Sequence, residues 1–407
     1  MRVFPLKNIA THSTPVLVFQ RDKQFLLRRI CSNSSPATYL LAHPRVADSA
    51  GSPATLEKDL SSGKSSNENS YVVSYLVNSC GLSPEVAISV SSKFSFGSPE
   101  KPDSVLNLLK QQGFTKSQIS AIVRRRPVLL RSNVKTLLPK FEFFQSIGVS
   151  RADLAKTLSF NPTLVTRSLE NQLIPCYNFL KSVVQSDKNV IAAMRRTSWI
   201  FLIDFRKDLI PNVTLLREIG VPDSSIALLL THFPEALIPK NAKFREVVNE
   251  VKDMGFDPLK TTFVLAVHAR SGDNKLTWNR SYEAYRKVGW SNDEIISAFR
   301  KHPSCMIISE KKIMNTINFL VKKMGWDYRM IVRCPALLFF NLEKRIIPRC
   351  LVIQVLASKG LIKKDMSLST ILLPGEKHFL DRFVTRFEEE VPLLLNVYQG
   401  KMDVAEL

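Results

Sequence analysis

Hydrophobic positions along most of the chain recur at the three- and four-residue spacing of an amphipathic helix. Leu169, Leu173, Tyr177, Leu180 and Val184, for example, lie 4, 4, 3 and 4 residues apart. Alternating Val, Ile and Thr runs bounded by turn residues, which would indicate strands, do not compete with this pattern. The sequence therefore predicts an all-α body.

Glycine followed by a large apolar residue recurs at regular intervals. The eight glycines are Gly81, Gly113, Gly148, Gly220, Gly255, Gly289, Gly325 and Gly360, spaced by 32, 35, 72, 35, 34, 36 and 35 residues. Glycine suits the left-handed conformation just past a helix end, and the apolar residue after it packs on the last turn. Each glycine therefore marks a helix end, and the doubled interval predicts one glycine lost near Val184.

Proline lies fourteen residues after the glycine in five repeats, at Pro127, Pro162, Pro234, Pro303 and Pro374. Ser198, Ala269 and Pro335 stand at or near the same place in the other repeats, and we call this place the proline position. Proline ends a helix because it lacks an N–H and crowds the preceding turn. A period near 35 residues repeated this often predicts a helical-repeat solenoid of about eight two-helix units.

Local signals divide each repeat into two helices. Residues 115–118, 150–153 and 291–294 have the pattern of a capping box and should start first helices. A further proline, at Pro139, Pro175, Pro211 or Pro348, should kink a second helix or mark its first turn. A bend repeated in this way predicts a curved superhelix. The segment 268–273 around Ala269 departs from the pattern and predicts a degenerate repeat or a bent joint.

The N-terminal 47 residues are basic, with seven Arg or Lys residues, many Ser and Thr, and one acid, Asp22. This composition predicts an organellar transit peptide over 1–47, with a disordered basic arm as the alternative. We expect residues 48–70 to form a disordered polar linker, 71–374 the repeats and 375–407 a C-terminal tail. Gly63-Lys64-Ser65 resembles part of a phosphate-binding loop, but Lys58 stands where that motif needs glycine, so we expect no nucleotide site there.

The charge of the chain favours a polyanionic partner. Its 407 residues hold 57 Lys and Arg against 36 Asp and Glu, a net charge of +21, and +15 remains after the leader is removed. No apolar run approaches the roughly 18 residues of a spanning helix. The six cysteines lack the spacing of a zinc ribbon and predict reduced, buried thiols. Catalytic motifs are absent as well, so we predict a protein without enzymatic activity, metal or cofactor.

The repeat resembles that of the mitochondrial transcription termination factor (mTERF) family. Residues 126–130 (RPVLL), 161–165 (NPTLV) and 334–338 (CPALL) have the form of its proline segment, and 173–175 (LIP) with 179–180 (FL) that of its second helix. The resemblance covers about residues 71–374, and residues 79–84 and 360–374 are similar to plant members especially. It implies a curved superhelix whose basic concave groove binds double-stranded DNA or structured RNA. We expect the protein to be a monomer.

That resemblance also implies a role in organellar transcription termination, transcript maturation or intron splicing, with transcription or splicing proteins as candidate partners. The Arg-rich leader favours the mitochondrion, with the plastid as the alternative. Two other functions stay open. A pentatricopeptide-type reader of single-stranded RNA has a similar period but no fixed proline in mid-repeat, and an α-solenoid can instead serve as a protein scaffold.

Two sets of cations recur at fixed places relative to the proline position. The pre-proline group lies one to three residues before it: Arg124, Arg125, Arg126, Arg195, Arg196, Arg300, Lys301 and Arg333. The post-proline group lies eight or nine residues after it: Lys135, Arg206, Lys207, Lys243, Lys311, Lys312 and Lys344. Stacked repeats would align each group along a phosphate chain. The alternative for the pre-proline group is structural, because cations stabilise helix C-termini.

Aromatic and histidine side chains carry less functional signal. Five phenylalanines on second helices should pack in the core, namely Phe141, Phe143, Phe144, Phe179 and Phe319. His232, His268 and His302 should lie at helix ends, too far apart to share a metal ion. The third repeat has Ser159, Phe160 and Asn161 before its proline and Glu170 after it, so we expect that any basic groove is not uniformly lined.

Overall fold

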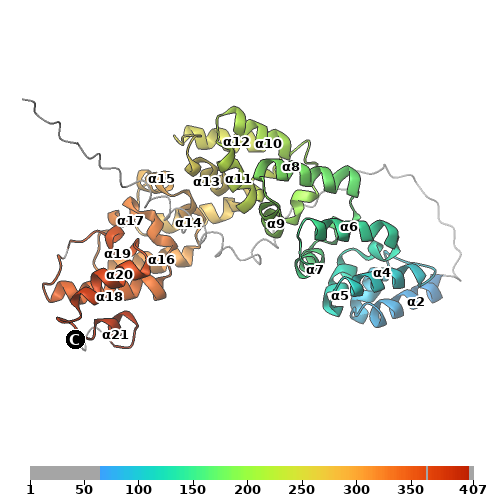
Figure 1. Cartoon of the computed structure of the whole chain (residues 1–407), viewed down its shortest axis with the longest axis horizontal. Coiled ribbons are helices and arrows are strands. Elements are labelled where there is room, and N and C mark those ends of the chain that lie inside the picture. Colours follow the sequence, from blue (N-terminus) through green and yellow to red (C-terminus); the bar gives the residue numbers. More distant parts are fainter. Residues whose placement is uncertain (1–64, 364, 403–407) are drawn as a thin grey trace, which may run out of the picture. The chain divides into compact units, whose positions relative to one another are not determined.

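The computed structural model describes residues 65–363 and 365–402, which form two compact units (Figure 1). The described part of the N-terminal unit comprises residues 65–250 and 258–264, and that of the C-terminal unit comprises 251–257 and the described residues from 265 onward. The predicted transit peptide, 1–47, and most of the predicted linker lie outside the described residues. Within them the chain is helical throughout and contains no strand, which confirms the all-α fold.

The helices follow one another in pairs along both units. In chain order, the α-helices up to residue 270 are α2 (Ser65–Asn78), α3 (Pro84–Ser91), α4 (Glu100–Gln111), α5 (Lys116–Arg125), α6 (Val134–Ser146), α7 (Arg151–Phe160), α8 (Ile174–Val184), α9 (Asp187–Arg196), α10 (Leu209–Glu218), α11 (Asp223–His232), α12 (Asn241–Asp253) and α13 (Thr261–Arg270). Those of the C-terminal unit are α14 (Lys275–Lys287), α15 (Asn292–Lys301), α16 (Glu310–Asn318), α17 (Arg329–Arg333), α18 (Ile347–Ser358), α19 (Leu368–Leu372), α20 (Glu376–Phe383) and α21 (Leu394–Tyr398). Helices α12 and α13 each contain residues of both units.

Short 3₁₀ turns join the two helices of a repeat, and they begin where the sequence predicts. Six of them are η2 (Pro127–Arg131), η3 (Pro162–Thr166), η5 (Ser198–Phe201), η6 (Pro234–Leu237), η8 (Pro303–Ile307) and η10 (Pro335–Phe339). Each starts at the proline position, including the repeat that has Ser198 there. First helices pack on first helices, as in α5 with α7 and α15 with α17, and second on second, as in α4 with α6 and α14 with α16. Each unit is therefore a stack of helix pairs, and the solenoid prediction is confirmed.

The residue before the proline position has a similar φ in all six of these repeats. The residue before it is Arg126, Asn161, Thr197, Phe233, His302 or Cys334, and its φ lies between −135° and −148°. A steric clash with the proline ring keeps the preceding residue out of the helical conformation and favours such a φ. Thr197 adopts it before Ser198 as well, so the surrounding repeat holds the turn even without the proline ring.

The predicted helix ends have the left-handed backbone that glycine accepts. All eight glycines have positive φ, between 68° and 95°. Where the spacing predicts a lost glycine near Val184, Gln185 ends α8 with a φ of 53°, and it is the one non-glycine residue with positive φ in the described chain. This repeat thus keeps the left-handed backbone conformation at the helix end although it has glutamine there instead of glycine.

Two of the three predicted capping boxes are complete. Thr115 with Gln118 and Ser291 with Glu294 each form both reciprocal hydrogen bonds. In the third, Ser150 accepts from the Asp153 backbone N–H, but the Asp153 carboxylate bonds the Ser150 hydroxyl at 2.6 Å rather than the Ser150 backbone. The aspartate side chain is one methylene shorter than glutamate, and its carboxylate also pairs with Arg195.

The second-helix prolines take up the two alternatives that the sequence allows. Pro139 lies inside α6, whereas Pro175 and Pro348 lie in the first turn of α8 and α18. A π-helical turn precedes each of the latter two, η4 (Leu169–Leu173) and η11 (Leu342–Ile346), and a third π turn, η9 (Phe319–Lys323), ends the second helix that begins as α16. At η4 and η11 the wider turn accommodates the carbonyls that the following proline leaves unpaired.

Two segments differ from the sequence-based boundaries. Helix α2 begins at Ser65, within the predicted linker, and the described part of the predicted tail is folded. Phe379, Phe383, Val391, Leu394 and Val397 are buried, and α21 packs on α18, because these apolar residues form one face of short helices. The degenerate repeat is present as predicted: after Ala269 a three-residue turn, η7 (Gly272–Asn274), replaces the usual one.

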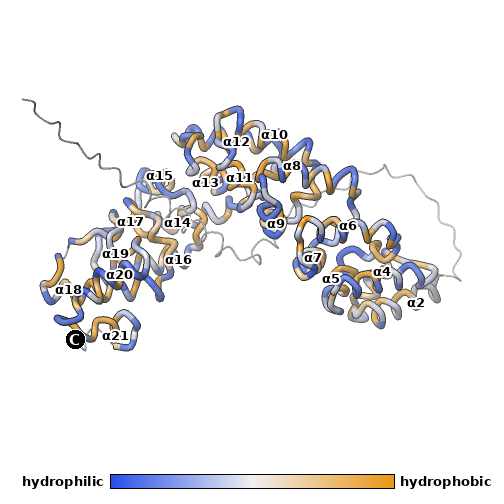
Figure 2. Tube along the Cα trace, viewed as in Figure 1, coloured by the Kyte–Doolittle hydropathy of each residue, from blue (hydrophilic) through white to orange (hydrophobic). Residues whose placement is uncertain are grey.

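The core is apolar along the length of each unit. In Figure 2 the colour alternates between hydrophobic and hydrophilic along most helices, as one-sided burial requires. Phe141, Phe144 and Phe319 are buried as expected, whereas Phe143 and Phe179 are half-buried. The five described cysteines are free thiols, and all but the half-buried Cys334 are buried.

Candidate nucleic-acid interface

The pre-proline group lies in the last turn of first helices and in the residue that follows, and part of it connects neighbouring repeats. Two residues before the proline position, the Arg125 guanidinium lies 5.9 Å from the Phe160 ring centroid, Arg196 Nε donates to the His232 carbonyl at 2.9 Å, and Lys301 Nζ reaches the Val332 carbonyl at 3.4 Å. In each case the partner lies at the end of the next first helix. These three cations therefore stabilise the stack itself.

The residue one place earlier contacts the preceding repeat in two cases. Arg195 forms an ion pair of 2.6 Å with Asp153, and Arg300 Nε donates to the Met254 carbonyl at 2.7 Å. The hydrogen bond from Ser150, and after it the one from Arg195, lower the pKa of the Asp153 carboxyl. Arg124, Arg126 and Arg333 are exposed and form no ion pair with a described residue. Five members of the pre-proline group thus contact a neighbouring repeat.

The post-proline group lies mainly in the first turn of second helices. Lys135 is the second residue of α6, Lys243 the third of α12, Lys311 and Lys312 the second and third of α16, and Lys344 the third of η11. Arg206 and Lys207 lie in the turn before α10, where Lys207 is 3.6 Å from Asp204. Lys135, Lys243, Lys311 and Lys344 are exposed and have no ion-pair partner among the described residues.

Helix electrostatics distinguish the two groups. A cation near a helix C-terminus is favourable by roughly 0.3–1 kcal/mol, and one near the N-terminus is unfavourable by a similar amount. The pre-proline group therefore needs no ligand, whereas lysines in the first turn of four second helices oppose the helix dipole. An anion at these N-termini would be favoured by the lysines and by the unpaired backbone N–H groups together. The post-proline group is thus the better candidate interface.

One member of the post-proline group takes part in a set of hydrogen bonds between repeats. Lys312 Nζ donates to the Phe339 carbonyl at 3.0 Å, at the end of the next 3₁₀ turn. The equivalent donors in other repeats are Lys140 to Val165, Gln172 to Ile203, Asn212 to Pro239, Ser281 to Ile308, and Arg345 to Pro374, each at 2.7 Å. These donors satisfy carbonyls that a short turn leaves without a backbone partner.

This set of donors was not predicted from the sequence, although a signal for it exists. Each donor is a polar side chain nine to fourteen residues after the proline position, within an otherwise apolar helix face.

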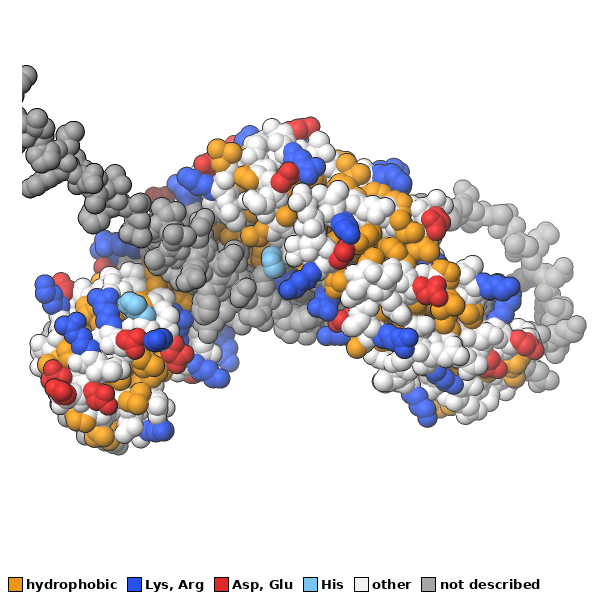
Figure 3. Space-filling view, in the orientation of Figure 1, with side chains coloured by type: hydrophobic (Ala, Val, Ile, Leu, Met, Phe, Trp, Pro, Cys, Tyr) orange, Lys and Arg blue, Asp and Glu red, His pale blue; other side chains and the backbone are white. Residues whose placement is uncertain are grey.

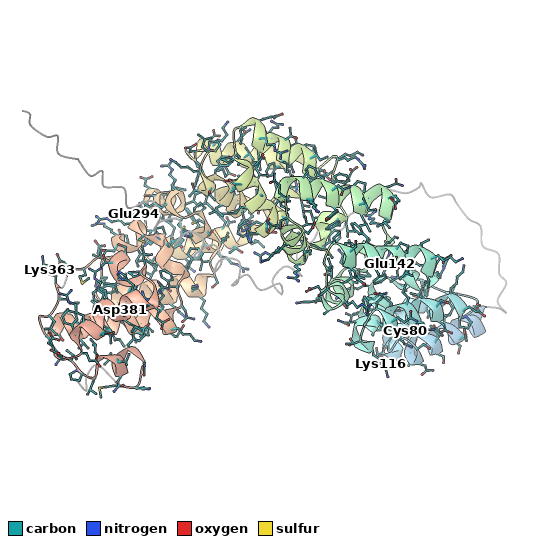
Figure 4. All side chains as sticks on the ribbon, in the orientation of Figure 1. Cys80, Lys116, Glu142, Glu294, Lys363 and Asp381 are labelled. Atoms are coloured by element: carbon teal, nitrogen blue, oxygen red, sulfur yellow. The ribbon has the colours of Figure 1, made fainter. Side chains whose placement is uncertain are left out.

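A shallow groove in the first complete repeat was not predicted either. It is lined by Lys116, Ser120 and Arg124 of α5 and by Gly81. Figure 4 labels Lys116 and Cys80, the residue before Gly81, in this part of the N-terminal unit. The four-residue spacing of the α5 side chains is its signal in the sequence.

Positive charge is not continuous on the face of the units that Figure 3 shows. On the face in view in Figure 3, Lys and Arg side chains form small separate groups with uncharged surface between them. The third repeat contributes to the gaps as expected, because exposed Phe160 stands two residues before its proline position and Glu170 in the first turn of η4. The cations recur by repeat and by helix end rather than as one patch.

Other kinds of site find no support within the described part of the chain. It contains no group of three His, Cys, Asp or Glu side chains arranged to hold a metal ion. The three histidines lie at or near first-helix ends, and burial lowers the pKa of His302 to about 4. Helices in this part are too short or too polar to cross a bilayer.

Comparison with known proteins gives consistent results. A family model described as mTERF matches residues 106–272 and 264–380. Transcription termination factor MTERF15, mitochondrial, of Arabidopsis thaliana is 24% identical over 301 residues, which cover 74% of this chain and 58% of that protein.

Two further relatives come from the same plant. Transcription termination factor MTERF8, chloroplastic, and transcription termination factor MTEF18, mitochondrial, are each 22% identical over 63% and 64% of this chain, and over 51% and 50% of their own lengths. The chain thus spans about half the length of the curated relatives it matches. Because the family model matches more than half of the sequence, over repeats whose helices, turns and glycines are those described above, this chain belongs to the mTERF family.

Proposed function

We propose that this chain is an organellar gene-expression factor that binds double-stranded DNA or structured RNA and acts without catalysis. The observation that carries the proposal is the post-proline group. Lysines occupy the first turn of α6, α12, α16 and η11, although a cation there opposes the helix dipole. A bound phosphate chain would turn each unfavourable position into a favourable one, and a net charge of +21 supports the same partner.

The proposed biological role follows the names of the relatives. All three are called transcription termination factors, two of them mitochondrial and one chloroplastic. We infer that this chain acts in transcription termination, transcript maturation or intron splicing, by holding a duplex or a folded transcript. Residues 1–47 would serve as the transit peptide, with the mitochondrion favoured over the plastid because the segment is rich in Arg.

A salt titration of the full chain tests this interface. Binding to duplex DNA and to a hairpin RNA is measured by fluorescence anisotropy over a range of salt concentrations. The logarithm of the affinity should fall by about 0.9 per log unit of salt for each duplex phosphate neutralised. The variant K135A/K243A/K311A/K344A should bind both probes more weakly and show a smaller slope.

A matched variant separates position from total charge. K156A/K252A/K322A/K323A removes the same charge from exposed lysines outside the first turns of second helices. It should bind within about twofold of the wild type, because only long-range attraction is lost. Equal weakening by both variants would refute the proposed interface, and the absence of binding to either probe at low salt would favour a protein scaffold instead.

A further inference from the structure

A polar cleft of about 350 Å³ lies between two successive second helices of the C-terminal unit. One wall is the first part of α16, with Lys311, Lys312 and Thr316, and the other is the end of η10 and the start of η11, with Asn341 and Glu343. Ligand pockets of proteins fall in the range of roughly 300–1,000 Å³. Two residues of the post-proline group, Lys311 and Lys312, line the cleft. The inference about its ligand therefore rests on the proposed function, and it concerns which nucleic acid is bound.

One end of the cleft is suited to an anion. Ser309 caps α16 by accepting from the Lys312 backbone N–H, and the N–H groups of Glu310 and Lys311 have no hydrogen-bond partner in the described chain. Lys311 is exposed without an ion pair, and the Lys312 ammonium is held 3.0 Å from the Phe339 carbonyl. Two ammonium groups and two free amides at one helix N-terminus match a phosphate group.

A buried hydroxyl gives independent evidence of a ligand. Thr316 lines the cleft and is fully buried, and its Oγ1 has no hydrogen-bond partner among the described residues. Buried hydroxyl groups in native proteins are almost always paired. An asparagine amide of the same wall, Asn315, also faces this cleft. A polar ligand in the cleft would supply the partner that Thr316 lacks.

The remaining polar group is a carboxylate, which a phosphate does not explain. Glu343 lines the cleft, is exposed, and forms no ion pair with a described residue. A carboxylate repels phosphate and accepts hydrogen bonds from hydroxyl and amino groups. In a nucleic acid strand, the hydroxyl next to the phosphate is the ribose 2′-hydroxyl, which RNA has and DNA lacks.

We propose that this cleft binds one ribonucleotide of an RNA strand. Its phosphate lies against Lys311, Lys312 and the free amides of α16, and its 2′-hydroxyl donates a hydrogen bond to the Glu343 carboxylate. The pair of cations supplies affinity, and the carboxylate makes that affinity specific for ribose. RNA is therefore the preferred target of the C-terminal unit.

The test compares one hairpin RNA with its fully 2′-O-methylated counterpart. Methylation keeps the phosphates and the A-form helix but removes the donor that Glu343 would accept. The full chain should bind the unmodified RNA about tenfold more tightly, the effect of one charge-assisted hydrogen bond. In Glu343→Ala the affinity for the unmodified RNA should fall by about tenfold, and that for the methylated RNA should stay or rise.

The matched control is Glu170→Ala. Glu170 holds the corresponding place in η4, but the preceding second helix, α6, has Lys135 followed by Thr136 where α16 has the lysine pair Lys311 and Lys312, so this variant should keep the wild-type preference. If Glu343→Ala strengthens the binding of both RNAs equally, the carboxylate only repels phosphate. If the substitution weakens the binding of both RNAs equally, the carboxylate binds a base amino group. Either result overturns the proposal. Failure to bind either RNA also overturns it, while salt-dependent binding of duplex DNA would leave the proposed function standing.

A second variant tests the buried hydroxyl. Thr316→Val keeps the shape of the side chain and removes an unpaired polar group, so the free protein should unfold at an equal or higher urea concentration. Affinity for the unmodified RNA should nevertheless fall severalfold. Unchanged RNA affinity in a folded Thr316→Val variant would show that the ligand does not reach this hydroxyl.

Discussion

At the scale of single residues, the repeat imposes its backbone on side chains that do not favour it. Gln185 ends α8 in the left-handed conformation that glycine adopts at the equivalent place in eight other repeat ends. Thr197 likewise takes, before Ser198, a φ of −148°, close to the φ that elsewhere precedes proline. Neighbouring repeats therefore determine the backbone conformation at these positions. The residue type at each position determines how much free energy that conformation costs.

Replacing Gln185 by glycine should stabilise the protein. A side chain at positive φ costs roughly 1–2 kcal/mol, and part of this gain is lost because glycine is freer in the unfolded chain. We expect the free energy of unfolding to rise by about 0.5–1 kcal/mol, measured as a higher urea midpoint with an unchanged slope. Gln185→Ala keeps the Cβ and should show no such gain; a gain as large as that of glycine would show that the backbone is not strained.

His302 should make the stability of the C-terminal unit depend on pH. Burial lowers its pKa to about 4, and its ring lies against the Phe339 ring, tilted by 31° with 4.6 Å between the centroids. In the unfolded chain the pKa is about 6.5, so between these values the unfolded state binds a proton that the folded state excludes. The histidine's contribution is therefore fully present above pH 6.5 and is lost as the pH falls toward 4.

His302→Phe isolates this contribution. Phenylalanine occupies the same place, before the proline position, at Phe233. Between pH 7 and pH 5 the wild type should lose about 2 kcal/mol of unfolding free energy more than the variant. Urea unfolding at the two pH values measures the difference, and parallel losses in the two proteins would mean that other groups, such as the carboxyls of Asp153 and Glu310, set the acid sensitivity.

At the scale of helices and turns, the boundaries were largely predictable because they depend on local chemistry. Proline positions, glycines and caps act through the backbone of a few residues, and the turns begin where those residues lie. The hydrogen bonds between repeats were not predictable in this way. The places of Lys140 and Lys312 on an otherwise apolar helix face mark them as unusual, but only the packing of the next 3₁₀ turn shows that they donate to its carbonyls.

Asn212 provides the sharpest test of these hydrogen bonds. It is fully buried, donates to the Leu237 and Pro239 carbonyls, and accepts from the Asn241 amide at 3.0 Å. Asn212→Leu keeps the size but leaves these partners unpaired, so the free energy of unfolding should fall by about 2–3 kcal/mol. The control Asn249→Leu, on the exposed face of α12, should change it by less than about 0.5 kcal/mol.

At the scale of the whole molecule, the positions of the cations along the repeats could be predicted from the sequence, but their roles could not. Both groups recur by repeat, yet the pre-proline side chains Arg196 and Lys301 bond carbonyls of the next first helix, whereas Lys135 and Lys243 have no ion-pair partner in the described chain. Periodicity fixes which helix end a residue occupies. It does not fix whether the side chain reaches a neighbouring repeat or solvent, because that depends on how closely the repeats pack.

The two groups should therefore separate stability from binding. Arg196→Ala and Lys301→Ala each remove a charge-assisted bond between repeats and should lower the unfolding free energy by about 1.5 kcal/mol. The salt dependence of their nucleic-acid binding should change little at a temperature where both variants remain folded.

Lys135→Ala and Lys243→Ala should show the reverse. Their stability should be unchanged or slightly higher, since each substitution removes a cation from a helix N-terminus. The slope of their affinity against salt concentration should be smaller. Should the pre-proline variants instead lose the salt slope while keeping their stability, the phosphate chain would run along the ends of the first helices, and the helix dipole would not be what directs it to the second helices.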